Sequence, residues 1–153
     1  MRRDIALFLG LVAIICGGII AAVIFLFDDG GGGESSVCDN PLAPRGESDI
    51  SQLGFQTEDA GLARVIEAAS AGDLQATEEA FFGDVHNFTR DVDQRLREVD
   101  EELAKELCEA VMTLEEELFA TDPSADAIAK HATRIRDLLR DAAHALGYAR
   151  PSE

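Results

Sequence analysis

The feature that most constrains this chain is an apolar run close to its start. Residues 5–27 read IALFLGLVAIICGGIIAAVIFLF and contain no charged side chain. A helix rises ~1.5 Å per residue, so a run of this length crosses a ~30 Å hydrocarbon layer. Arg2 and Arg3 precede the run, and two aspartates follow it. Because the basic flank stays in the cytoplasm, the sequence predicts a single-pass cell-membrane protein with residues 1–4 inside and the rest extracytoplasmic.

The alternative for this run is a cleaved signal peptide, whose apolar region is normally shorter and ends at a small-x-small cleavage site. Here the run closes on FLF followed by aspartate, which favours a retained transmembrane helix. Ala13, Gly17 and Ala21 recur at every fourth position, and a face of small residues lets another helix pack closely. The sequence therefore predicts a membrane-protein partner or self-association through this helix.

The composition changes after the apolar run. Residues 28–57 are rich in Gly, Ser, Pro and acidic side chains, which bury too little apolar surface to offset the entropy of ordering, so this segment is predicted to be a flexible linker. The whole chain has 30 acidic and 13 basic residues and a formal charge of −17. This charge repels nucleic-acid phosphates and favours basic protein surfaces or cations as partners. Nucleic-acid binding is not expected.

Residues 58–147 carry apolar side chains at steps of three and four, the spacing of amphipathic helices. Four amphipathic helices with short connections bury their apolar stripes by packing antiparallel. The predicted fold class is all-α, with one transmembrane helix and an up-down-up-down four-helix bundle, followed by a tail at 148–153. The predicted helices cover 58–71, 73 to about 98, 100–118, and a fourth stretch from a cap at Asp122 or Ser124 to residue 146.

The stretch FFGDVHNFTRDVD, residues 81–93, raises the question of a metal or catalytic site. On a helix, Asp84 and His86 point to nearly opposite sides and cannot share one ion. Asp91 and Asp93 each precede an arginine by four residues, the spacing of ordinary helix ion pairs. Most of this charge is therefore expected to form a solvated face.

His86 is the exception, because it lies at the flank of the apolar stripe, where a neighbouring helix can supply a partner. The simple interpretation is a hydrogen-bonded structural histidine. The alternative is a transition-metal site between facing helices. Its predicted ligands are His86, Asp93, Glu109 and His131, with Glu115 and Glu116 as further partners for His86.

The three cysteines differ in their predicted surroundings. Cys16 lies in the transmembrane helix, whereas Cys38 and Cys108 are extracytoplasmic, where disulfides form. A Cys38–Cys108 bond would tie the linker to the third helix. The alternative is two free thiols, with Cys108 in the core and Cys38 available for an intermolecular bridge.

Motifs that carry chemistry are missing from the sequence. It has no Gly-rich phosphate loop, nucleophile elbow, H-E-x-x-H or C-x-x-C-H motif, so no enzyme activity and no cofactor are predicted. The expected function is an interaction or accessory module, a subunit of a membrane complex. The alternative is an extracytoplasmic domain that captures or relays a metal cation such as iron or copper.

Three stretches of the predicted helical region also have a family likeness. AGDLQATEEAFF, then VDQRLREVDEELAKELCEAV and, after a proline break, IRDLLRDAAHAL resemble the extracytoplasmic helical domain attached to bacterial FTR1-type iron permeases and related iron-uptake bundles. Asp93 stands near where that family tends to carry an acidic residue, while Arg90 and Cys108 stand where carboxylates are expected. Only one membrane helix is predicted. The resemblance therefore implies a related helical domain without permease activity.

Overall fold

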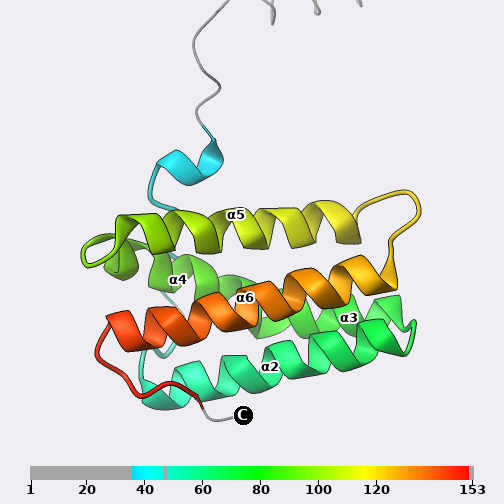
Figure 1. Ribbon diagram of the computed structural model, residues 1–153, viewed down its shortest axis with the longest axis horizontal. Coiled ribbons are helices and arrows are strands. Elements are labelled where there is room, and N and C mark those ends of the chain that lie inside the picture. The colour runs from blue at the N-terminus through cyan, green and yellow to red at the C-terminus, as the bar shows by residue number, and fades with distance from the viewer. Residues whose placement is uncertain (1–35, 47, 152–153) are drawn as a thin grey trace, which may run out of the picture. The chain divides into compact units, whose positions relative to one another are not determined.

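The structure, a computed structural model that describes residues 36–46 and 48–151, is built of four helical segments around one core (Figure 1). This part of the chain contains no strand, so the prediction of an all-helical domain is confirmed. The second segment is one continuous path of three elements, α3, a π-helical turn η2, and α4. The elements are η1 (Val37–Asp39), α2 (Gln52–Ser70), α3 (Leu74–Ala80), η2 (Phe81–Val85), α4 (His86–Arg97), α5 (Glu101–Leu118) and α6 (Ala125–Ala145).

Successive helical segments run in opposite directions, as the colours of Figure 1 show. α2 packs against α3, η2 and α6, and α5 packs against α4 and α6. Short connections force this antiparallel arrangement, because the next helix must turn back to cover the apolar stripe of the previous one.

The apolar stripes read from the sequence form the core. Phe81, Val85, Phe88, Val92 and Leu96 are all buried along the second segment, and the stripes of the other three helices meet them. Val99 follows Leu96 at the spacing of this stripe, so the periodicity predicts it in the core, but the structure differs. Val99 is 58% exposed, because α4 ends at Arg97 and Val99 lies in the turn that follows.

The helix ends follow the predicted caps. Asp73, Asp100 and Ser124 each accept a backbone N–H three residues ahead, at 3.0, 3.0 and 3.3 Å. Such caps satisfy amide groups that have no partner within the helix. Gly72 and Gly147 follow the ends of α2 and α6 with φ of 73° and 84°, the left-handed conformation that glycine adopts easily.

The start of α2 differs from the prediction. The helix begins at Gln52 rather than at residue 58, with Ser51 accepting the Gly54 N–H at 3.2 Å. The predicted linker boundary at residue 57 therefore falls inside a helix. Phe55 explains the earlier start, because its ring is buried in the core and contacts Phe88 at 5.0 Å between centroids.

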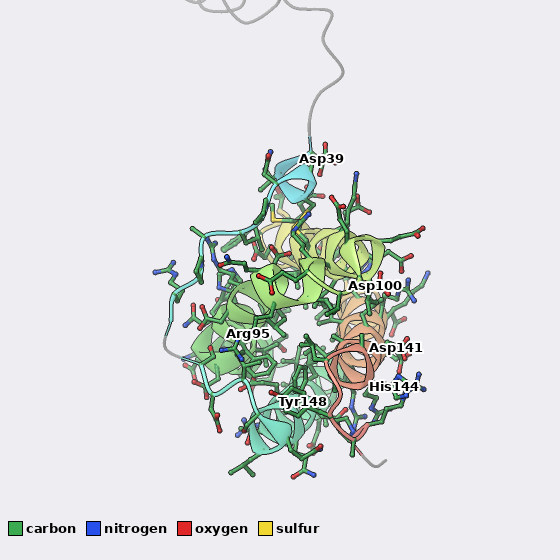
Figure 2. All side chains as sticks on the ribbon, turned by 90° about the vertical axis from the view of Figure 1, so that its left-hand side faces the viewer. Asp39, Arg95, Asp100, Asp141, His144 and Tyr148 are labelled. Atoms are coloured by element: carbon green, nitrogen blue, oxygen red, sulfur yellow. A yellow bond between two sulfur atoms is a disulfide. The ribbon has the colours of Figure 1, made fainter. Side chains whose placement is uncertain are left out.

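Residues 36–46 and 48–51, which we call the strap, lie against the bundle. Figure 2 shows this segment passing from η1, beside Asp39, along the outside of α4 to α2. Leu42 donates its backbone N–H to Asp93 at 2.8 Å, and Arg97 donates to the carbonyl of Cys38 at 2.7 Å. These bonds hold the described part of the strap along α4.

Asp91 is the main acceptor for the middle of the strap. Its carboxylate receives the backbone N–H groups of Arg45, Gly46 and Ser48, the last two at 2.8 and 3.0 Å. Burial alone would raise the pKa of Asp91, but these donors outweigh it and lower the pKa to about 2. Asp91 and Asp93 are thus buried, and the prediction that they belong to a solvated face is wrong. The predicted Asp93–Arg97 ion pair is present at 3.0 Å.

Cys38 and Cys108 form a disulfide between the strap and α5, with a Cα–Cα distance of 5.7 Å. The prediction of this bond is confirmed, and both sulfurs are buried. An ion pair between Lys105 and Asp39 lies on the same side of α5.

The chain also makes contacts after α6. Tyr148, labelled in Figure 2, follows α6. It donates its hydroxyl to the carbonyl of Ile50 at 2.9 Å, and its ring lies 5.4 Å from that of Phe55. The first residue of the predicted tail therefore packs on the beginning of α2.

No helix within residues 36–46 and 48–151 is both long and apolar enough to cross a membrane. The predicted transmembrane segment 5–27, with its small residues Ala13, Gly17 and Ala21, lies outside the described residues.

Gly54 marks the closest approach between the strap and α2. A Cβ built there would lie 1.7 Å from the backbone oxygen of Asp49, whereas one at Gly83 would meet no atom within 4 Å. We expect Gly54→Ala to lower the free energy of unfolding by roughly 1–3 kcal/mol, because the strap must shift. Gly83→Ala should leave it unchanged or raise it by up to about 1 kcal/mol. Chemical denaturation of both variants checks this pair, and equal effects would contradict the close packing of the strap.

Candidate functional site

The most unusual backbone feature is the π-helical turn η2, formed by the FFGDV part of the stretch singled out above. The His86 N–H donates to the carbonyl of Phe81, five residues back, instead of four. Such turns occur mostly as single bulges within α-helices, often at functional sites. Gly83 is exposed at its centre, and Phe81 and Val85 are buried on its inner side. The turn therefore widens the helix while both apolar side chains stay in the core.

A buried carboxyl group, Glu58 of α2, lies beside this turn. The residue is 6% exposed, and its Oε2 atom has no hydrogen-bond partner within the part of the chain that the structure describes. An ionised carboxylate that is removed from water without a partner is costly. Burial raises the pKa of Glu58 to about 7, and the negative charge of Asp84 adds to the effect, while Arg64 opposes it.

The neighbouring residue, Asp59, is also a buried acid, but positively charged side chains compensate its charge. Its two oxygens accept bonds from Arg136 at 2.7 and 2.9 Å, and from Arg140 at 2.7 Å. Burial tends to raise the pKa of Asp59, but the two guanidinium groups outweigh it and lower the pKa. Adjacent acids on one helix thus have opposite environments. Asp59 holds α2 against α6, whereas Glu58 has no ion pair with a described residue and feels Arg64 only through its charge.

Glu58 lines a cleft between α2, the strap and the second helical segment. The cleft has a volume of ≈ 260 Å³. Its wall combines two further carboxylates, three neutral polar side chains and an apolar part. The lining residues are Ser48, Asp49, Leu53, Gly54, Thr57, Glu58, Asp84, Asn87 and Phe88.

Close packing shapes the floor beside this cleft. A Cβ at Gly61 would lie 2.9 Å from Val85 Cγ2 and 3.5 Å from Glu58 Oε2. Only glycine therefore lets α2 approach the π-helical turn this closely. The approach places the Glu58 carboxyl against the bundle rather than in open solvent.

His86 lies on another side of the second helical segment and has a partner on α5. Its Nε2 is 2.9 Å from Glu115 Oε1, so Glu115 is the partner among the predicted candidates. Burial lowers the pKa of His86 and Arg90 and Arg45 add to this, outweighing the opposite effect of Glu115. A neutral imidazole that donates to the carboxylate satisfies both groups, which is the structural role predicted first.

Aromatic side chains surround this pair. Phe82 stacks on Phe119 at 5.5 Å between ring centroids and contacts His86 at 5.7 Å. Phe119 is 72% exposed, at the end of α5. The stack covers one side of the imidazole ring of His86.

The four predicted metal ligands are not brought together. Asp93 accepts bonds from Leu42 and Arg97, and Glu109 is exposed on α5 beside η1. His131 lies half-buried on α6. Among residues 36–46 and 48–151, no three His, Cys, Asp or Glu side chains are grouped so that they could hold one metal ion. Of the residues singled out for metal binding, only His86 meets one of its candidate partners, Glu115.

No known protein family, curated protein or solved structure matches this chain. The resemblance to iron-permease-associated domains stays a prediction from the sequence. The Glu58 cleft was not predicted from the sequence, although one signal for it was present. Glu58 precedes Leu62 by four residues and Val65 by seven, so it occupies a position on the apolar stripe of α2. A carboxylate at such a position indicates either a buried pair or a site.

Proposed function

We propose that this chain is a single-pass, membrane-anchored interaction module, an accessory subunit that presents its acidic helical domain on the extracytoplasmic side. The observation that supports this most directly is the disulfide between the strap and α5. Disulfides persist in oxidising compartments, which lie outside the cytoplasm. The basic residues before the apolar run support the same orientation.

The strap lies between the predicted membrane anchor and the helical domain in the sequence. It enters the domain after the predicted transmembrane segment and is tied to it covalently at Cys38 and by hydrogen bonds at Asp91 and Asp93. A displacement of the strap would therefore act on α4 and α5 through these bonds. A linker without such bonds would only keep the domain nearby.

Thiol labelling in intact cells tests the topology. In a Cys16→Ser background, we expect Asp122→Cys, in the exposed loop between α5 and α6, to react with a membrane-impermeant maleimide. The matched variant Asp4→Cys, which keeps Arg2 and Arg3, should react only after permeabilisation, since the positive-inside rule places residues 1–4 in the cytoplasm. Labelling of Asp122→Cys only after permeabilisation, or recovery of the chain in the soluble fraction with its N-terminus near residue 28, would refute the anchored orientation.

The accessory role needs a separate experiment. Chemical cross-linking in membranes, purification of the full chain and mass spectrometry should identify the same membrane protein in repeated preparations. The net charge of −17 favours a partner with a basic extracytoplasmic surface. Purification of the chain alone, under conditions that preserve known membrane complexes of the same cells, would contradict the role of subunit.

A further inference from the structure

The Glu58 cleft joins two independent features that point to a ligand. The first is the buried Oε2 atom, which has no hydrogen-bond partner among residues 36–46 and 48–151, although Glu58 is only 6% exposed. The second is the cleft itself, which Glu58 lines together with the carboxylates of Asp49 and Asp84. A carboxylate in this position gains most from a ligand that brings a positive charge and a hydrogen-bond donor.

The rest of the lining limits the kind of cation. Leu53, Gly54 and Phe88 give the cleft an apolar side, whereas Ser48, Thr57 and Asn87 offer neutral polar groups. A metal ion would use only oxygens and would leave the apolar side without a partner. An organic cation with a short alkyl stem matches both sides, because its head can donate to carboxylates while its stem covers apolar surface.

We propose that the cleft between α2, the strap and the π-helical turn is a binding site for a small organic cation, a primary ammonium or guanidinium group on an alkyl stem, with Glu58 as its principal acceptor. Asp84 and Asp49 add to the negative potential that attracts the cation. The π-helical turn brings Asp84 and Asn87 to the cleft, and Gly61 allows the turn to approach α2. The deviation from the α-helix thus contributes residues to the site.

Two sources supply this chemistry. One is a lysine or arginine side chain of the partner, in which case the site deepens the proposed function and rests on it. The other is a free alkylamine. The volume of ≈ 260 Å³ exceeds the roughly 30 Å³ that one water molecule occupies in the liquid, and leaves room for either.

Calorimetric titration of the full-length protein in detergent micelles tests the site without a partner. The probes are n-butylguanidinium and n-butylammonium chloride, with 1-butanol and KCl as the neutral and inorganic controls. We expect both organic cations to bind at pH 8 and the two controls to give no comparable signal. Binding should weaken about tenfold at pH 6, because a carboxyl with a pKa of about 7 is then mostly protonated.

The charged groups that bear on Glu58 define the variants. Asp84 of η2 and Arg64 of α2 act on Glu58 through their charges, and Asp49 of the strap lines the same cleft. Glu58→Gln should reduce the affinity for both cations at least tenfold and remove the pH dependence, since a charge-assisted bond is lost. The matched control is Glu67→Gln, which makes the same charge change at an exposed position of α2 and should bind like wild type.

A capped arginine, Nα-acetylarginine amide, separates the two sources. If it binds as well as n-butylguanidinium, a protein side chain fits the cleft, and if only the free alkyl cations bind, the ligand is a free amine. Both results support the site. Equal affinity of wild type and Glu58→Gln, binding of K⁺ alone, or no binding at all would overturn it. The topology and cross-linking experiments are independent of these titrations, so a failure of the proposed function is recognised separately.

Discussion

We expect the Cys38→Ser variant to lose about 4 kcal/mol of the free energy of unfolding. The disulfide joins residues that are 70 positions apart, and in the chain-entropy description a loop of this length contributes about 4 kcal/mol by restricting the unfolded chain. The loop contains α2 and the entire second helical segment, so the unfolded ensemble is restricted over much of the domain. Equilibrium denaturation of the full-length chain in micelles, followed by circular dichroism, measures the loss.

Reduction provides the control for this variant. A reducing agent should destabilise the wild-type chain by about the same amount and have no effect on Cys38→Ser. Cys16→Ser should behave like wild type, because Cys16 does not take part in the disulfide. If wild type and Cys38→Ser have equal stability under oxidising conditions, the disulfide does not hold the strap in the native protein.

Sequence periodicity was sufficient for α5 and α6 and insufficient for the strap. α5 and α6 bury a regular stripe and begin at polar caps, so their bounds follow from local patterns. The strap has no such pattern. Its bonds to Asp91 and Asp93 join residues more than forty positions apart, and a carboxylate that accepts distant backbone N–H groups has the same local sequence as one in solvent. This is why Asp91 and Asp93 were assigned to a solvated face.

The candidate site shows the same limit. The sequence drew attention to residues 81–93, and this stretch does contain the π-helical turn, but as a neighbour of α2 rather than as a metal site. Regular helix geometry cannot anticipate a turn that is one residue wider. The predicted first helix begins at Glu58, and an acid is favourable in the first turn of a helix. In the structure α2 begins at Gln52, and Glu58 is buried. The error of six positions at the helix start concealed the site.

The second large effect concerns Glu58 itself. We expect Glu58→Gln to be more stable than wild type by about 3 kcal/mol at pH 8.5 and to have nearly the same stability at pH 4. The pKa of Glu58 is about 7 in the folded chain and has an ordinary value of 4.5, a difference that corresponds to roughly 3 kcal/mol. Glutamine stays neutral throughout and resembles the protonated acid in size.

The direction follows from proton binding. Between pH 4.5 and 7 the folded chain holds the Glu58 proton and the unfolded chain does not, so the stability of wild type falls as the pH rises through this range. Above pH 7 both states are ionised and the loss is complete. Asp91 acts in the opposite direction at lower pH, since its pKa is about 2, but it is present in both chains and cancels in their difference.

Denaturation midpoints of wild type, Glu58→Gln and Glu67→Gln at pH 4, 6 and 8.5 measure this effect. Glu67→Gln should follow wild type at each pH. Asp84→Asn should reduce the loss of stability at high pH, because it removes a negative charge that, together with burial, raises the pKa of Glu58. A constant difference between wild type and Glu58→Gln at all three pH values would show that Glu58 does not titrate in this range.

The buried charge of Glu58 lowers the stability of the folded chain, and Glu58→Gln removes this cost. A cation that binds and neutralises Glu58 would stabilise the folded chain in the same way. The cleft would then bind its ligand most strongly above pH 7, where ionised Glu58 lowers the stability of the free domain most.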